Sequence, residues 1–169
     1  VENGHMAGVL AYEAKDAEDG RRYVREIAKT KPDLIKLMIT GGVLDAKKEG
    51  EPGVLRMSPE IVKACCDEAH KLGFKVAAHV ESPLGVTVAL EGGVDTIEHG
   101  ADFTDADMAN MRSKGTKVVA TFSPAVPLAN LPPRVTKLTS LATYNTQVLL
   151  ECMTYGARRC AIEGVTLGM

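Results

Sequence analysis

The sequence has no hydrophobic run long enough to span a membrane. Its longest apolar stretches are the length of a β-strand, whereas a spanning helix needs about 20 consecutive apolar residues. The first residues also lack the charged and then apolar layout of a secretory signal peptide. We therefore expect a soluble, cytoplasmic protein without a membrane partner.

An excess of charge of one sign is also missing. The chain has 20 basic and 22 acidic side chains, interspersed along its length, for a formal net charge of −2. A nucleic-acid-binding or membrane-surface protein usually carries a basic patch or tail. The charge pattern therefore argues against nucleic acid and anionic lipid as partners.

Cysteine is scarce and is not arranged as a framework. Cys65 and Cys66 are adjacent, Cys152 and Cys160 fall within one expected helix, and the chain has no CxxC pair. This spacing fits neither a set of disulfides nor a cysteine zinc site. We predict that the four thiols are reduced and serve as small, buried apolar side chains.

What the chain does have is a regular alternation of strand and helix. With 169 residues, 45% of them apolar, it is long enough to bury the core of one domain. Near-continuous apolar runs predict buried parallel strands, and capping residues predict the helices between them. The expected strands are 33–40, 74–80, 94–99, 116–122 and the beginning of one in 164–169, and the expected helices begin after Asp16, at 58, at 82, at 104 and at 135 or 140.

This alternation predicts an α/β fold with right-handed crossovers. Two architectures satisfy it, an open doubly wound sheet or a (β/α) barrel, and periodicity does not separate them. Pro124, Pro127 and the Pro132-Pro133 pair predict a long irregular connection after residue 122.

Three polar residues interrupt otherwise apolar strands, namely Lys36, His79 and His99. Each alone has a simple structural explanation, because a lysine can extend to water and a histidine can be hydrogen-bonded in the core. Together they place three metal-capable side chains at the carboxyl ends of parallel strands, where sites of α/β proteins form. A convergent metal site explains all three.

Three segments of the chain resemble a known family. The strings DLIKLMITGGV, KVAAHVESPLGVTVALEGGVDTIEHGA and GVTLGM are similar to the imidazolonepropionase-related and prolidase-like branch of the amidohydrolase superfamily, over roughly residues 5 to 169. The resemblance implies that residues 1–169 form a single partial TIM-type (β/α)8 barrel, about strands 4 to 7 plus the start of strand 8, of a longer amidohydrolase.

The resemblance also implies a metal site. Lys36 would be carbamylated by carbon dioxide and bridge two divalent metals, and His79 and His99 would bind one of them, with zinc as the expected metal and one or two ions in total. The chemistry agrees, because a carbamate is an anionic oxygen donor whereas an ammonium group cannot bind a cation. Metal-bound water would then attack an amide or cyclic amide carbonyl.

Some of the family's residues are missing from the chain. Its four histidines, His5, His70, His79 and His99, form no H-x-H pair, and the acid–base aspartate is expected beyond Met169, so no catalytic residue is assigned within the chain. We expect a truncated, inactive piece whose exposed strand edges favour a homo-oligomer. The resemblance makes His5, in NGHMAG, a substrate-binding candidate, whereas His70 is expected on a helix surface.

The leading hypothesis is a metal-dependent hydrolase of C–N bonds in small amide or dipeptide-like substrates. Many prolidase-like relatives have a substrate-binding tyrosine soon after the strand-5 histidine, but here Val80-Glu81 follow His79, which leaves other amides open. One alternative is a catalytically inactive metal- or ligand-binding fragment. A phosphate-binding sheet is the second, although Gly41-Gly42 matches neither GxGxxG nor a P-loop.

Overall fold

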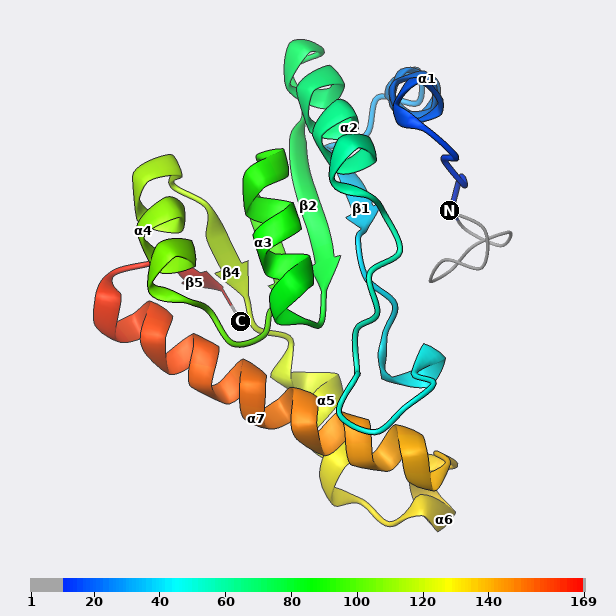
Figure 1. Cartoon of the computed structure of the whole chain (residues 1–169), viewed down its shortest axis with the longest axis vertical. Helices are drawn as coiled ribbons and strands as arrows, with labels where there is room; N and C mark the ends of the chain where they lie inside the picture. Colours follow the sequence, from blue (N-terminus) through cyan, green and yellow to red (C-terminus); the bar gives the residue numbers. More distant parts are fainter. Residues whose placement is uncertain (1–10, 169) are drawn as a thin grey trace.

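The computed structural model describes residues 11–168, so His5 lies outside the described residues. It confirms an α/β fold in which each of the first three strands is followed by a helix (Figure 1). The strands are β1 Leu34–Met38, β2 Lys75–Val80, β3 Thr96–His99, β4 Lys117–Val119 and β5 Leu167–Gly168; the helices are α1 Ala17–Ala28, the short η1 Val43–Asp45, α2 Pro59–Lys71, α3 Pro83–Gly92, α4 Asp105–Lys114, α5 Phe122–Asn130, α6 Pro133–Thr136 and α7 Ser140–Glu163.

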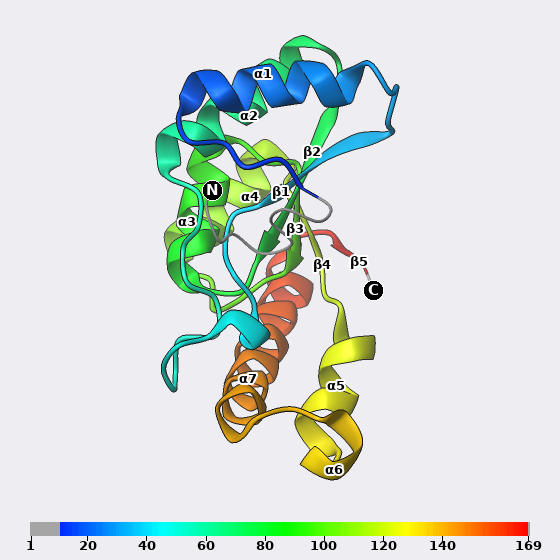
Figure 2. The same cartoon turned by 90° about the vertical axis from the view of Figure 1, so that its right-hand side faces the viewer.

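All five strands run parallel and lie side by side in their sequence order, from β1 to β5. The helices α2, α3 and α4 lie together on one side of this sheet (Figures 1 and 2). A doubly wound sheet would reverse its strand order and place helices on both faces. The order and the one-sided helices are those of a barrel wall, so the structure separates the two architectures that the sequence left open.

The core lies between the sheet and these helices. Side chains alternate along β1, where Ile35 and Leu37 are buried and Lys36 is exposed. Val76 and Ile97 continue the buried layer on β2 and β3. This alternation places Lys36 on the face of the sheet opposite the helix-packed core.

Hydroxyl side chains at the start of the helices act as the caps that the sequence predicts. The Ser58 side chain accepts a hydrogen bond from the Ile61 backbone at the start of α2. At the start of α4, Thr104 and Asp107 form a reciprocal capping box. These contacts satisfy backbone N–H groups that have no partner within the helix.

The prediction for residues 116–136 was wrong in part. The strand ends at Val119 rather than residue 122, and the expected irregular connection contains α5 and α6. Pro124 falls in the first turn of α5, where a helix needs no N–H donor. Pro127 lies inside the helix and removes one hydrogen bond, but Ala125 of α5 packs with Leu149 and Met153 of α7. Tertiary packing therefore outweighs the cost of the proline.

Among residues 11–168, no helix is both long enough and apolar enough to cross a membrane. The four cysteines are unbridged, as the sequence predicts, and Cys65, Cys66 and Cys160 are buried, but Cys152 is only half-buried.

Candidate metal centre

The two strand-end histidines lie next to each other. His79 is on β2 and His99 ends β3, where it pairs in register with Val80. Their rings meet edge to face, with centroids 4.6 Å apart and an interplanar angle of 73°. The structure thus brings together two residues that the sequence placed on separate strands.

His99 has an unusual backbone that ends its strand. Its φ of 70° lies in the left-handed region, which histidine enters more readily than most residues with a side chain. By strict alternation His99 would face the same way as its register partner Val80, toward the core. The left-handed turn breaks this alternation and allows the His99 ring to contact His79.

Hydrogen bonds orient both imidazoles. His79 is buried, and its Nε2 donates to the Gly41 carbonyl oxygen at 3.1 Å. Because a carbonyl can only accept, a neutral ring carries its lone pair on Nδ1. The Nδ1 atom of His99 is hydrogen-bonded to the Thr121 hydroxyl, and donation to that oxygen leaves Nε2 as the acceptor. Such outer contacts are how proteins aim histidine ligands at a metal.

Glu81 is the site residue that sequence reasoning missed. It follows β2, and one donor atom each from His79, Glu81 and His99 lie within 4.8 Å of one another. Its carboxylate oxygen Oε2 accepts a hydrogen bond from the Val43 backbone at 3.1 Å. The H-x-E spacing at the end of an apolar strand was the signal available in the sequence, because residues two apart on a strand share a face.

Burial changes the protonation of Glu81. Only 7% of the residue is exposed, and loss of solvent raises the pKa of its carboxyl group to about 8, although the hydrogen bond from Val43 acts in the opposite direction and Asp45 reinforces the rise. A cation placed beside this carboxyl group would favour its ionised form. The group is therefore suited to binding a cation.

Lys36 lies on the same face of the sheet as His79, but further from the carboxyl ends of the strands. It pairs in register with Ala77, two residues before His79, so its Cα is displaced by roughly 7 Å along the strand direction. Desolvation by the surrounding protein lowers the pKa of the Lys36 amine, while the charge of Glu98 on β3 opposes that change. A lowered pKa gives more of the neutral amine, the form that reacts with carbon dioxide.

The loop after β1 covers this end of the sheet. Gly41 donates to the Val54 carbonyl at 2.8 Å, and Thr40 forms an isolated antiparallel bridge with Leu55. A Cβ atom on Gly53 would lie 2.5 Å from the Glu81 carbonyl carbon and oxygen. Only glycine fits there, so the loop packs directly on the backbone of Glu81.

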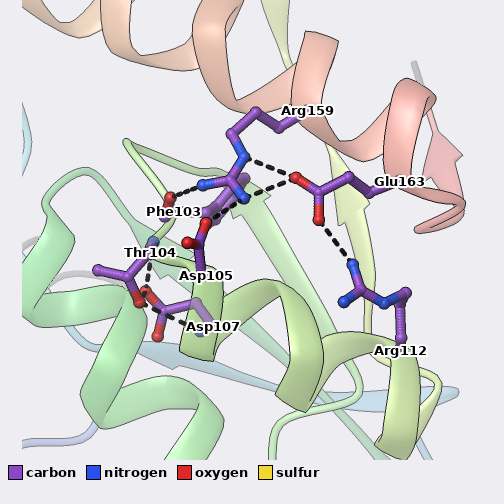
Figure 3. Close-up of polar contacts among 7 residues, drawn as sticks. All are labelled: Phe103, Thr104, Asp105, Asp107, Arg112, Arg159 and Glu163. Atoms are coloured by element: carbon purple, nitrogen blue, oxygen red, sulfur yellow. Dashed lines mark hydrogen bonds and ion pairs between the residues drawn. The ribbon is translucent and has the colours of Figure 1, made fainter.

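The loop that follows His99 is tied to the last helix. Arg159 on α7 donates to the Phe103 carbonyl at 2.6 Å and forms ion pairs with Asp105 and Glu163 (Figure 3). Glu163 also pairs with Arg112 on α4 at 2.7 Å. These contacts tie the connection between β3 and α4 to the last helix.

His70 has no place in this arrangement. It is exposed, and its Nε2 lies 2.7 Å from a carboxylate oxygen of Asp95, in the loop that leads into β3. The predicted surface position is confirmed.

The donor set suits a divalent transition metal. Two imidazole nitrogens and a carboxylate oxygen are ligands that zinc accepts, and three protein ligands leave a coordination position for water. The residues present therefore fit a metal of the kind that the sequence resemblance implies.

Comparison with known proteins identifies the family. Residues 5–158 match the sequence model of the Amidohydrolase family. A Bifidobacterium longum protein provisionally identified as a prolidase superposes with a TM-score of 0.88 at 34% identity, over 99% of this chain and 41% of its own. A Xaa-Pro dipeptidase structure with bound methionine has a TM-score of 0.80 at 26% identity, over 98% and 42% of the two chains.

A curated protein is also similar to this chain in sequence. Ochratoxinase from Aspergillus niger is 32% identical over 110 residues, which is 65% of this chain and 22% of the relative. The chain therefore spans well under half the length of the proteins that it matches. Its five parallel strands match part of an amidohydrolase barrel, and by family match and fold the chain belongs to the amidohydrolase family.

Proposed function

We propose that the protein containing this chain is a metal-dependent hydrolase of C–N bonds. The observation that carries the proposal is the contact of His79 with His99 at the carboxyl end of a parallel sheet, with Lys36 on the neighbouring strand facing the same way. In barrels of this kind, active sites form at that end. His79 and His99 bind the metal, which is zinc in one or two copies.

Lys36 contributes as a carbamate. Its lowered pKa supports reaction of the neutral amine with carbon dioxide, and the product would offer two anionic oxygens to the metal. When bound, zinc supplies an acidic water and polarises a carbonyl group. The residues of this chain hold the ligands in place through the Gly41 carbonyl and the Thr121 hydroxyl.

The substrate is a small amide or dipeptide-like molecule. Support comes from the names of the similar structures, a Xaa-Pro dipeptidase and an ochratoxinase. The described strands would be about strands 4 to 7 and the start of strand 8 of the barrel, and the longer protein would supply the remaining ligands and the acid–base group. In this piece of the barrel on its own, the edges of β1 and β5 have no further partner strand within residues 11–168, which supports self-association of the isolated piece.

Metal analysis of purified variants tests the proposal. His79→Ala and His99→Ala should each lose most of the bound zinc, measured by mass spectrometry of the metal, whereas His70→Ala should retain it. Lys36→Ala should remove a carbamate signal seen by carbon-13 NMR after addition of labelled bicarbonate. Full zinc content in both site variants would contradict the metal centre, and zinc binding without hydrolysis of amides by the longer protein would favour the ligand-binding alternative.

A further inference from the structure

We propose that Glu81 is a third metal ligand, so that β2, β3 and the residues after them form a His–carboxylate–His site for a divalent transition cation. This inference rests on the proposed function, which places the metal on His79 and His99. The geometry points to Glu81 because its carboxylate and the two imidazoles already have donor atoms within 4.8 Å of one another.

The three donors are near the spacing that zinc requires. Zinc–nitrogen and zinc–oxygen distances of about 2.0–2.2 Å in a tetrahedron correspond to donor separations of roughly 3.5 Å. The donors must therefore approach by at most about 1.3 Å. Small changes in the side-chain torsions of the three residues are of the size needed for that movement.

The surroundings of Glu81 also favour a cation. The residue is 7% exposed, and His79 is 4% exposed. Within residues 11–168, no lysine or arginine forms an ion pair with Glu81. An ionised carboxylate in such a place is costly unless a cation compensates it, and a metal ion held by the adjacent histidines would provide that compensation.

Each of the three donors is already oriented by a second contact. Gly41 fixes the His79 ring through Nε2, and Thr121 contacts His99 through Nδ1. The Val43 backbone holds Oε2 of Glu81, while the Glu81 N–H donates to the Thr40 hydroxyl at 3.0 Å. Outer hydrogen bonds of this kind are a general feature of protein metal sites.

The test is a zinc titration of the purified protein, in competition with a chromophoric chelator, for the wild type and four variants. Glu81→Gln should weaken zinc binding by at least about tenfold. Glutamine keeps the volume of glutamate, and its carbonyl can still accept the hydrogen bond from Val43, so the metal-free fold should persist. Glu81→Asp keeps the donor type on a shorter arm and should bind zinc with intermediate affinity.

Glu98→Gln is the matched control for charge. Glu98 pairs in register with His79, and its carboxylate accepts from Thr96 at 2.8 Å, but it is not among the three clustered donors. Glu98→Gln should therefore leave the affinity within a few fold of wild type. Equal weakening of zinc binding in Glu98→Gln and Glu81→Gln would mean that the negative charge near the site, and not direct coordination by Glu81, sets the affinity. That result would overturn the role of Glu81 as a ligand.

His79→Ala separates this inference from the proposed function. Loss of zinc in His79→Ala with wild-type affinity in Glu81→Gln would refute the Glu81 ligand and leave the histidine centre intact. Zinc binding unaffected by His79→Ala would refute the centre itself. The visible spectrum of the cobalt-substituted protein gives a second readout, because loss of a ligand in Glu81→Gln should alter the intensity of its d–d bands. An unchanged spectrum would count against the inference.

Discussion

Arg159 Nη1 donates a hydrogen bond to the carbonyl oxygen of Phe103 at 2.6 Å, across 56 residues of sequence (Figure 3). Phe103 lies in the loop that begins directly after His99. The contact therefore joins the long helix α7 to the segment that follows a candidate metal ligand. Folding of α7 and formation of the site should be coupled.

Arg159→Ala should destabilise the protein. It removes a hydrogen bond to the Phe103 carbonyl and ion pairs to Asp105 and Glu163, and a hydrogen bond from a charged group contributes about 1.5–3 kcal/mol. Urea unfolding should show that the free energy of unfolding falls by an amount in that range. Arg158→Ala is the control, because Arg158 is an exposed neighbour on the same helix. Similar losses of unfolding free energy in both variants would show that the contacts of Arg159 do not stabilise the fold.

Gly156→Ala should also destabilise the fold. A Cβ atom there would lie 2.5 Å from the Ala101 carbonyl oxygen and 2.8 Å from the Phe103 ring. Overpacking costs about 1–3 kcal/mol, whereas alanine gains about 1 kcal/mol of helix propensity over glycine, so the net loss of unfolding free energy should be up to about 2 kcal/mol. Ala161→Gly, at an exposed position of α7, measures the propensity effect alone. A stabilised Gly156→Ala variant would mean that the loop yields without strain.

Asp95 should make the stability of the fold depend on pH. Burial alone would raise the pKa of Asp95, but hydrogen bonds from Lys75, His70 and the Val76 N–H together hold it below its ordinary value of 3.8. A lowered folded pKa stabilises the protein at neutral pH, and this contribution is lost as the pH falls below about 4 and through the folded value.

Asp95→Asn tests this dependence. The variant should be less stable than wild type by about 1–3 kcal/mol at pH 7, and the difference should shrink as the pH is lowered below the ordinary aspartate value of 3.8. Asp67→Asn, at an exposed carboxylate paired with Lys63, should show little effect at either pH. A pH-independent difference for Asp95→Asn would argue against an ionic origin.

The cysteines should differ in reactivity. Burial raises the pKa of Cys65 to about 11, of Cys66 to about 12 and of Cys160 to about 11. Desolvation also raises the pKa of Cys152, but this thiol is only half-buried and so more accessible to a reagent. Because the thiolate is the reactive form, a thiol reagent at pH 8 should label Cys152 first and the other three only after unfolding in urea. Rapid labelling of more than one thiol in the native protein would contradict this packing.

Local signals in the sequence determined most of the elements of this fold. Serine and threonine caps, a proline at the first helical position and apolar strand runs act over a few residues, so α2, α3, α4 and the first three strands lie close to where they were predicted. The same local reasoning selected Lys36, His79 and His99 as candidates, because a polar residue in an apolar strand is visible without knowledge of its neighbours.

Only the tertiary structure decided the rest. Strand order and one-sided helices selected the barrel wall, since periodicity is the same in both parallel architectures. Packing of α5 on α7 made a helix of a proline-containing segment. The left-handed turn at His99 and the position of Glu81 beside both histidines depend on backbone geometry and on contacts between strands, which alternation within a single strand does not encode.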